Sequence, residues 1–374
     1  MGSTFLIAAG GTGGHLFPAE ALAHELGRRG HVVHLATDHR ATDYGRDFPA
    51  AAVHVVASAT FGDRSPLGLA RSAVRIATGQ LQSLALVGRL KPAAAIGFGG
   101  YPTLPPLLAA SLRGVPTVVH EANAVMGRAN RFLARRTTAV ATSFATTRLL
   151  DDPAKAVTTG NPVRPRVVAA ASPYDVPAAA GPFRLVVFGG SQGARVFSEL
   201  VPPALALLAP DLGARLRLVQ QVRPEDMARV RAGYSELGIE AELLSFFPDL
   251  PERIAGAHLV VCRSGASSVS ELAVIGRPSI LVPLPHALDA DQKSNALELE
   301  RAGGALMAEQ ASLTPDVLAG HLSTLMNDPG RLAAMATAAR GEGRPDAVQR
   351  LADLVEHVGA GGRPADFARG RPTP

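Results

Sequence analysis

The sequence is poor in the residues that stabilise small secreted domains. A single cysteine, Cys262, among 374 residues rules out an internal disulfide, which favours a reducing compartment. Tryptophan is absent and aromatic residues make up only 5%, whereas hydrophobic residues make up 47%. The core must therefore be built from Ala, Val, Leu and Ile, a composition that suits helices packed on parallel strands.

Long apolar runs and a strong charge are also missing. No apolar run approaches the ~20 residues needed to cross a bilayer, and the first residues, "MGSTFLIAAGG", lack the basic start and long apolar stretch of a secretory signal. These features predict a cytoplasmic chain. The 37 Lys and Arg residues outnumber the 32 Asp and Glu residues, which gives a net charge of +5. This charge permits an anionic partner but identifies none.

The chain consists of two halves with the same pattern, and its length also favours two domains. In the first half, short apolar runs alternate with helical segments, of which the first is expected at 18–30 with Pro18 in its first turn. The second half, from "FRLVVFGGSQGARVFSEL", repeats the order of strand, glycine-rich turn and helix. The predicted strands are 4–9, 32–37, 51–56, 93–98, 116–121 and 138–143, then the apolar start of the segment 183–205, and strands near 215–221, 240–245, 257–262 and 279–282.

This alternation predicts an α/β fold with parallel sheets and right-handed crossovers. The boundary between the halves is "TTGNPVRPRVV" (158–168), where Gly, Asn and Pro interrupt both periodicities. We therefore expect an N-terminal domain at 1–162, a C-terminal domain at 163–343 and a cleft between them. Residues 359–374 have too little apolar surface to bury, and we expect them to be disordered.

Four glycine-rich junctions follow predicted strands. Ligands of doubly wound sheets bind where a strand meets a helix, and glycine lets main-chain N–H groups close on an anion there. The alternative is that the glycines only form tight turns. Their recurrence at equivalent places favours a bound phosphate or diphosphate, although no dinucleotide or P-loop motif is present. The junctions are Gly10–Gly14, Gly97–Gly100, Gly189–Gly193 and Ser264–Gly265.

The most informative junction is "VVCRSGASSVSELAVIGRP" (260–278). Arg263 places a positive charge beside the expected anion site, and Ser267 and Ser268 offer hydroxyl and N–H groups at the start of a helix. Glu271, three residues after Ser268, has the spacing of a capping box. The same carboxylate has the chemistry to accept two ribose hydroxyls, and spacing does not separate these two interpretations.

His15 lies where the first glycine-rich turn becomes a helix. An imidazole there can accept a proton from a hydroxyl near neutral pH, or it can be a capping or packing histidine. The other histidines form no metal-binding spacing, no nucleophile elbow is present, and no pair of acids resembles a glycosidase site. One candidate base and many anion-binding groups indicate a transferase whose leaving group is a diphosphate.

Six motifs in order over residues 5–358 resemble those of the bacterial MurG family, in glycosyltransferase family 28. They are "GGTGGH", "GFGGYPT", "HEAN", "GNPVR", "GGSQGAR" and "RSGASSVSE". The resemblance implies a GT-B fold, with two Rossmann-like domains and a last helix (344–358) that crosses back onto the first. It also implies inverting transfer of N-acetylglucosamine, without a metal or other cofactor, from UDP-N-acetylglucosamine to undecaprenyl-pyrophosphoryl-N-acetylmuramyl-pentapeptide (lipid I). The product is lipid II for peptidoglycan, made at the cytoplasmic face of the membrane.

Carried over by position, the resemblance implies two sets of site residues. His15 is the catalytic residue, acting as general base or orienting the attacking hydroxyl, and the acceptor side comprises Thr12, Gly13, Gly14, Tyr101 and Asn123. The UDP-sugar side shares Thr12, Gly13, Gly14 and Asn123 and adds Arg164, Ser191, Phe246, Phe247, Arg263, Ser267, Ser268, Glu271, Asp291, Gln292 and Asn295. Two positions depart from the family pattern: Ala122 stands where Gln is common, and Asp291 where some members have Gln or His.

A lipid acceptor requires docking to an anionic membrane, and the segment 65–91 has a suitable composition. Apolar and basic residues mix in it as in an interfacial helix, and each basic side chain near anionic lipid contributes ~1 kcal/mol. An ordinary surface helix covering the first sheet is the alternative, and different faces can serve both. The apolar residues are Leu67, Leu69, Val74, Ile76 and Leu81, and the basic ones are Arg71, Arg75, Arg89 and Lys91.

Three rival functions remain. Another GT-B transferase and a UDP-N-acetylglucosamine 2-epimerase share the expected fold, but the epimerase needs no lipid acceptor. A basic protein that only binds nucleic acid or a membrane is disfavoured because the charges are dispersed, aromatic residues are few and no basic run is interleaved with them.

Overall fold

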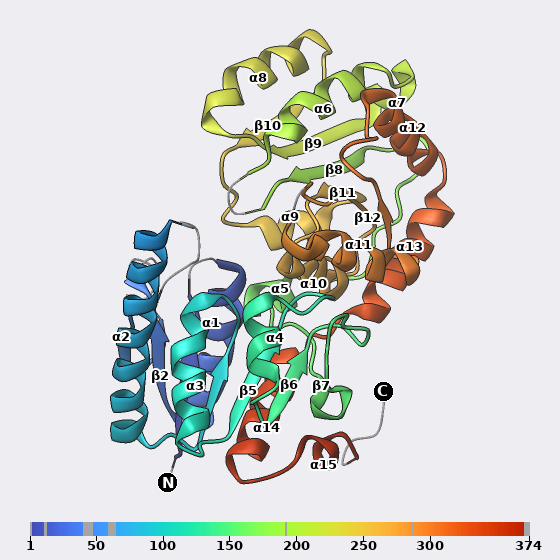
Figure 1. Cartoon of the computed structure of the whole chain (residues 1–374). Coiled ribbons are helices and arrows are strands. Elements are labelled where there is room, and N and C mark those ends of the chain that lie inside the picture. The colour runs from blue at the N-terminus through green and yellow to red at the C-terminus, as the bar shows by residue number, and fades with distance from the viewer. Residues whose placement is uncertain are drawn as a thin grey trace. The chain divides into compact units, whose positions relative to one another are not determined.

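The computed structural model describes residues 2–10, 13–39, 48–58, 65–190, 193–285 and 287–369. The chain divides into two compact units (Figure 1). The first unit comprises Met1–Arg164 and Pro345–Pro374, and the second comprises Pro165–Arg344. Each unit contains one sheet whose strands are all parallel, which confirms the predicted fold class.

The first unit contains a seven-stranded sheet in the order β3-β2-β1-β4-β5-β6-β7. The apolar runs predicted as strands form its first six strands, and the three-residue edge strand β7 was not predicted. The strands are β1 (Thr4–Ala8), β2 (Val32–Thr37), β3 (Ala52–Val55), β4 (Ala94–Gly97), β5 (Thr117–Glu121), β6 (Ala139–Thr142) and β7 (Ala156–Thr158).

Helices cover both faces of this sheet. On one face α1 and α14 share an apolar cluster with β1 and β4, and on the other face α2 and α3 pack against β1, β4 and β5. Both faces of the central strands are therefore buried, which explains their unbroken apolar sequences. The helices are α1 (Gly13–Arg28), α2 (Pro66–Leu90), α3 (Leu104–Leu112), α4 (Arg128–Ala134), α14 (Ala347–Gly359) and α15 (Pro364–Arg369), with 3₁₀ turns η3 (Tyr101–Thr103) and η4 (Pro153–Lys155).

Helix α1 begins earlier than the sequence predicts. It starts at Gly13, so Pro18 lies inside the helix and not in its first turn. Pro18 is the sixth residue of the helix, beyond the first four N–H groups that have no partner inside it, so the helix lacks the hydrogen bond that an N–H at position 18 would have given to the carbonyl oxygen of Gly14. The extra turn places His15 on the helix itself.

Helix α14 belongs to the first unit, although the whole second unit precedes it in the sequence. Leu351, Leu354, Val355 and Val358 recur at helical spacing and are fully buried, and burial of each contributes about 1.5–3 kcal/mol. The guanidinium of Arg29, directly after α1, pairs with Asp353 (2.7 Å) and Glu356 (2.6 Å) on α14.

The predicted disorder of residues 359–374 is wrong for the part that the structure describes. Residues 360–369 continue from α14 into α15. Phe367 packs against the apolar cluster of the first sheet, and its ring contacts His357 at 5.6 Å between centroids. This partly buried aromatic side chain ties the segment to the first unit. Residues 370–374 lie outside the described residues.

The second unit contains a six-stranded sheet in the order β10-β9-β8-β11-β12-β13. Its first five strands in sequence were predicted, and the three-residue edge strand β13 was not. The strands are β8 (Phe183–Phe188), β9 (Leu216–Gln221), β10 (Ala241–Leu244), β11 (Leu259–Cys262), β12 (Ser279–Leu281) and β13 (Ala305–Met307).

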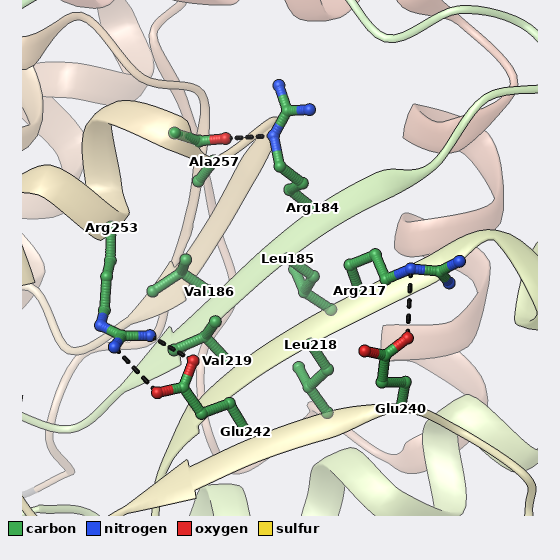
Figure 2. A pocket seen from close by; sticks show the side chains of 11 residues that line it. Arg184, Leu185, Val186, Arg217, Leu218, Val219, Glu240, Glu242, Arg253 and Ala257 are labelled. Atoms are coloured by element: carbon green, nitrogen blue, oxygen red, sulfur yellow. Dashed lines mark hydrogen bonds and ion pairs between the residues drawn. The ribbon is translucent and has the colours of Figure 1, made fainter.

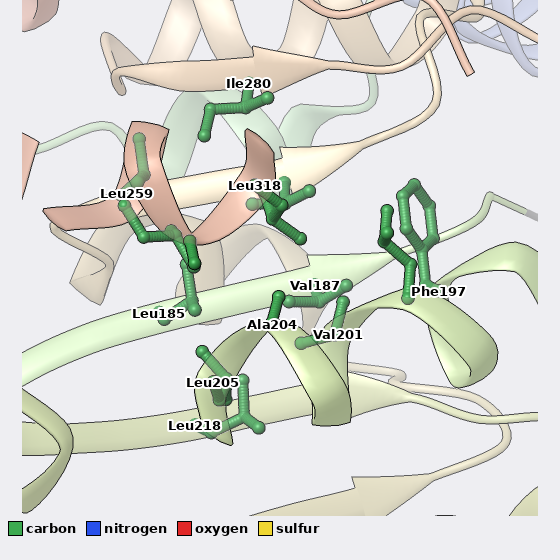
Figure 3. Packing of buried hydrophobic residues seen from close by; sticks show 14 of the residues in the cluster. Leu185, Val187, Phe197, Val201, Ala204, Leu205, Leu218, Leu259, Ile280 and Leu318 are labelled. Carbon is green, nitrogen blue, oxygen red and sulfur yellow. The ribbon is translucent and has the colours of Figure 1, made fainter. Parts of the chain in front are cut away.

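The core of the second unit lies between this sheet and the helices α6, α8 and α12. Phe197, Val201 and Leu205 of α6 meet Leu185 and Val187 of β8, as Figure 3 shows. The helices are α5 (Pro165–Ala170), α6 (Arg195–Ala206), α7 (Pro210–Arg215), α8 (Met227–Glu236), α9 (Leu250–Gly256), α10 (Ala266–Ile275), α11 (Asp291–Arg301), α12 (Pro315–Met326) and α13 (Pro329–Glu342), with 3₁₀ turns η5 (Pro224–Asp226) and η6 (Leu288–Ala290).

Candidate active site

The four glycine-rich junctions flank the two points where strand order reverses. In the first sheet, order reverses between β1 and β4, which lead into Gly10–Gly14 and Gly97–Gly100. In the second sheet it reverses between β8 and β11, which lead into Gly189–Gly193 and Ser264–Gly265. Such switch points are where doubly wound sheets bind ligands. Each unit therefore presents one candidate site at the carboxyl edge of its sheet.

His15 joins the two loops of the first unit. A Cβ built on Gly99 would lie 3.2 Å from His15 Cε1, and one built on Gly100 would lie 3.6 Å from Cδ2. Both glycines have positive φ, 92° and 77°, so glycine serves the backbone conformation as well as the close approach. The imidazole is thus packed against the turn that follows β4.

The surroundings of His15 favour its neutral form. Burial lowers the pKa of His15, and the nearby main chain of Phe98 acts in the opposite direction. Its Nδ1 atom is buried and makes no hydrogen bond among the described residues. A histidine whose pKa lies below the ordinary value of 6.5 is neutral at pH 7, which is the form that accepts a proton.

A polar cluster beside His15 was missed as a unit by the sequence analysis. The buried carboxylate of Glu121 accepts hydrogen bonds from Asn123 N (3.0 Å), Asn123 Nδ2 (3.1 Å), Gly127 N (2.9 Å) and Asn130 Nδ2 (2.8 Å). Burial raises the pKa of Glu121, and these donors oppose that rise. Glu121 therefore organises the segment after β5, including the predicted residue Asn123.

His120 completes this cluster. Burial lowers its pKa to about 4, and a Coulombic interaction with His15 contributes. Its Nε2 lies 3.3 Å from the carbonyl oxygen of Gly160, so the segment "GNPVR" reaches the same edge of the sheet. The one available signal was that His120 and Glu121 end a predicted strand, as the site residues of parallel sheets do.

Other predicted residues of the first unit lie near this edge. Tyr101 starts η3 directly after Gly100, and Gly13 and Gly14 start α1. The guanidinium of Arg164 lies over the ring of Phe17, 5.3 Å from the ring centroid. Phe17 follows His15 by two positions on α1. Thr12 lies outside the described residues.

In the second unit, helix α10 points its N-terminus at the switch point. Its cap is Gly265, so Ser267 and Ser268 occupy the second and third helical positions. The capping-box interpretation of Glu271 is wrong, because that motif requires Ser268 to be the cap and Glu271 the third helical residue. Glu271 instead lies in the second turn, with its side chain 8% exposed. The ribose interpretation stays a prediction.

Arg263 is directed into the protein. Its guanidinium donates to the carbonyl oxygens of Val282 (3.2 Å) and Pro283 (3.0 Å) and to the Oε1 atom of Gln310 (2.7 Å). It is 9% exposed, and burial lowers its pKa. In this arrangement Arg263 fixes the segment after β12. Its two Nη atoms already donate to protein oxygens and do not form the diphosphate contact that the resemblance implies.

The start of α11 is tied to the same loop. Ser264 Oγ donates to the carbonyl oxygen of Gln292 (2.8 Å), and Asn295 Nδ2 donates to the carbonyl oxygen of Ser264 (3.2 Å). The side chain of Gln292 accepts from Leu284 N (3.0 Å). Burial raises the pKa of Asp291, which accepts from Gln292 N at 2.7 Å. The predicted sugar-binding residues therefore lie beside the α10 loop.

The segment after β10 is held from several sides. Gln221 Nε2 donates to the carbonyl oxygen of Ser245 (3.1 Å), and Arg166 donates to that of Pro248 (2.8 Å). Phe247 is buried, and the guanidinium of Arg253 lies over its ring, 4.6 Å from the ring centroid. Phe246 is 65% exposed. Ser191 lies outside the described residues.

A separate cavity of about 300 Å³ lies on the β8–β9–β10 face of the second sheet, beside α9. None of the predicted site residues lines it. As Figure 2 shows, Arg253 pairs with Glu242 and Arg217 with Glu240 across its apolar floor. Because Arg184 is also paired, with Asp175, the arginines of this cavity are already matched by carboxylates.

Twin doubly wound units, each with a candidate site at the carboxyl edge of its sheet, define the GT-B class of fold, and the comparisons assign the family. The models of the glycosyltransferase family 28 N-terminal and C-terminal domains match residues 5–142 and 184–351. The chain belongs to glycosyltransferase family 28 and, by its relatives, to the MurG group within it.

Two curated relatives are 58% identical. One, from Chelativorans sp. (strain BNC1), matches over 99% of both chains, and the other, from Rhodopseudomonas palustris (strain BisB18), over 96% of both. Both are named UDP-N-acetylglucosamine–N-acetylmuramyl-(pentapeptide) pyrophosphoryl-undecaprenol N-acetylglucosamine transferase. The chain is thus a glycosyltransferase.

Solved structures agree with this assignment. The crystal structure of Acinetobacter baumannii MurG superposes with a TM-score of 0.80 at 30% identity, covering 95% of this chain and 99% of that one. A UDP-N-acetylglucosamine 2-epimerase superposes with a TM-score of 0.65 at 14% identity, covering 96% and 98%. That likeness shows the fold alone, so the comparisons do not favour the epimerase rival.

Proposed function

We propose that this enzyme transfers N-acetylglucosamine from UDP-N-acetylglucosamine to the C4 hydroxyl of undecaprenyl-pyrophosphoryl-N-acetylmuramyl-pentapeptide. Full-length identity of 58% to transferases named for this reaction is the observation that carries the proposal. The two switch-point sites support it, because donor and acceptor each contain a diphosphate and each unit has glycine-rich loops suited to one.

The second unit binds the donor in this proposal. The amides at the start of α10 and the hydroxyls of Ser267 and Ser268 hold the diphosphate, since the N-terminus of a helix attracts anions. The buried carboxylate of Glu271 accepts the ribose hydroxyls, and the main chain of Phe247 meets uracil. Asp291, Gln292 and Asn295 lie near the sugar.

The first unit binds the acceptor. His15 accepts the proton of the C4 hydroxyl as the hydroxyl oxygen attacks the anomeric carbon of N-acetylglucosamine. The bond from that carbon to the β-phosphate oxygen breaks on the opposite face, and UDP leaves with the electron pair, which inverts the anomeric configuration. Tyr101 and Asn123 line the acceptor side. The α10 amides and serine hydroxyls that hold the diphosphate also stabilise the negative charge that it gains as it leaves.

Among the described residues, no three of the His, Cys, Asp and Glu side chains gather as metal ligands. The proposed mechanism assigns the charge of the leaving group to main-chain amides and hydroxyls and gives no step to a metal ion.

A labelled-donor assay tests the proposed reaction. Radiolabelled N-acetylglucosamine should move to a lipid I analogue only when enzyme, UDP-N-acetylglucosamine and acceptor are all present, and other UDP-sugars should transfer poorly. Conversion of UDP-N-acetylglucosamine to its 2-epimer without acceptor would contradict the proposal and support the epimerase rival.

Helix α2 supports a peripheral location at the cytoplasmic face of an anionic membrane. Its C-terminal part covers the first sheet through the buried Leu86 and Val87, whereas Val74 and Leu81 are 65% and 69% exposed. The side chains of Leu67 and Leu69 lie outside the described part. Within that part, no helix is long and apolar enough to span a bilayer. A further exposed apolar side chain of the first unit is Phe132 on α4, which is 47% exposed and has the guanidinium of Arg136 over its ring. This pairing of an apolar and a basic side chain also suits an anionic membrane surface.

Replacing Val74 and Leu81 together with serine should weaken binding to anionic vesicles about tenfold or more. Each loses part of the roughly 1.5–3 kcal/mol that burying such a side chain contributes. Vesicle co-sedimentation measures the effect, with Leu207→Ser of the second unit as the control at an exposed site. Unchanged vesicle binding together with unchanged turnover on vesicle-borne acceptor would remove α2 from the docking surface.

A further inference from the structure

The donor site needs a positive charge that Arg263 does not supply. A leaving diphosphate gains negative charge, and cationic side chains commonly stabilise it together with main-chain amides. The two Nη atoms of Arg263 are paired with two carbonyl oxygens and Gln310, and its Nε, which makes no hydrogen bond among the described residues, belongs to a side chain that is only 9% exposed. We therefore searched the edge of the second sheet for another cation.

Arg223 lies at this edge, against the glycine-rich loop that follows β8. It comes two residues after the end of β9, the strand that pairs with β8. A Cβ built on Gly193 would lie 3.3 Å from Arg223 Cγ and 3.8 Å from its Nε. The stem of the arginine therefore packs against Gly193, at a distance that a larger side chain there would disturb.

The guanidinium of Arg223 has capacity for an anion. Its Nε is buried and makes no hydrogen bond among the described residues. Its ion pair is a long one, 3.9 Å from Nη1 to Glu225 Oε1, and the side chain is 37% exposed. A buried charged donor without an acceptor is costly, so a bound anion would stabilise this arrangement, and the exposed fraction leaves the guanidinium accessible to one.

The described ends of the loop beside Arg223 have defined conformations and contacts. Gly189 N donates to Gln221 Oε1 (2.9 Å), which ties the loop to the end of β9. Gly190 and Gly193 have positive φ, 86° and 65°. A glycine-rich turn of this kind at the end of a strand presents main-chain N–H groups to an anion.

We propose that Arg223 is a further substrate-binding residue, which donates to the diphosphate of UDP-N-acetylglucosamine beside the Gly189–Gly193 loop. The proposal rests on the proposed function, because it takes the donor nucleotide to be the ligand. It assigns to Arg223 the charge that the resemblance assigned to Arg263. No atom moves between protein and substrate in this role, which is electrostatic.

Inhibition of the transfer reaction by UDP and by uridine tests the proposal. Arg223→Gln should raise the inhibition constant of UDP about 10- to 100-fold, the range expected for lost charged hydrogen bonds, and leave that of uridine unchanged. Arg223→Lys should recover part of the loss, because it restores the charge without the planar fork. The matched control is Arg229→Gln on α8, whose guanidinium pairs with Asp226 at 2.8 Å.

Three results would overturn the assignment. They are an unchanged UDP constant in Arg223→Gln, an equal loss for UDP and uridine, or an equal loss in Arg229→Gln. Thermal unfolding of each variant identifies a general folding defect, in which case Arg223→Lys alone decides. A wild-type enzyme that turns over without inhibition by UDP would instead contradict the proposed function, so the two failures are distinguishable.

Discussion

Replacing His15 with alanine is expected to lower kcat about 100-fold or more while the affinity for UDP stays the same. A positioned general base contributes roughly 10²–10⁴-fold. The change affects the proton acceptor of the first unit, whereas the proposed contacts with the diphosphate, ribose and uracil at α10, Glu271 and Phe247 lie in the second. Steady-state transfer to a lipid I analogue gives kcat, and calorimetry with UDP gives the affinity.

His24→Ala is the matched control for this variant, because His24 lies on the same helix with its side chain 61% exposed. It should retain full activity. Normal turnover in His15→Ala would remove His15 from the mechanism, and a parallel loss in His24→Ala would point to damage of helix α1 instead.

The pH dependence of kcat/KM provides an independent test of the same residue. A base must be neutral to accept a proton, so activity is present above the pKa of His15 and lost as the pH falls through it. Because burial lowers this pKa from 6.5, the acidic limb should lie below pH 6.5, and it should disappear in His15→Ala. An acidic limb at or above that pH in the wild type would contradict the role of the buried imidazole.

Replacing Gly189 with alanine should reduce kcat/KM about 10²–10³-fold, the scale of losing preorganised donors at a developing charge. The added Cβ would lie 2.2 Å from Ala194 N and 2.4 Å from the carbonyl carbon of Gly193. Main-chain atoms cannot move aside as a flexible side chain does, so the loop after β8 must open. The loss should appear chiefly as weaker binding of UDP.

Gly213→Ala is the control for this substitution. Gly213 lies in α7, and nothing lies within 4 Å of the position of its added Cβ. Alanine should stabilise the helix there by about 0.5–1 kcal/mol without changing turnover. Full activity and unchanged UDP affinity in Gly189→Ala would mean that this loop does not contact the donor.

Much of the fold was predictable because central parallel strands are buried on both faces. Runs such as "TFLIA" and "FRLVVF" stand out as unbroken apolar segments followed by glycine. The edge strands β7 and β13 have only three residues each, too few for periodicity to mark. The start of α1 was mispredicted because proline usually opens a helix, whereas Pro18 lies inside this one.

The site was predictable to the extent that it depends on strand ends. His15, Ser267 and Asn123 could be placed at the carboxyl edges because each follows a predicted strand closely. Contacts between distant segments could not be predicted. Gln310, 47 positions further on, accepts a hydrogen bond from the guanidinium of Arg263. Arg223 contacts Gly193 from the segment that follows the neighbouring strand β9.

The same limit explains Glu271 and Asn130. Spacing gave Glu271 two interpretations, and only the observed cap at Gly265 removed one of them. Asn130 reaches Glu121 from helix α4, nine residues on, and no local pattern identifies it as the partner of that carboxylate.

A crystal structure with bound UDP tests the central claim most directly, namely that switch-point loops hold the diphosphates. The account predicts the nucleotide at the carboxyl edge of the second sheet, with its diphosphate between the Gly189–Gly193 loop and the N-terminus of α10 and its ribose at Glu271. UDP bound in the cavity on the β8–β9–β10 face, or anywhere away from that edge, would contradict it.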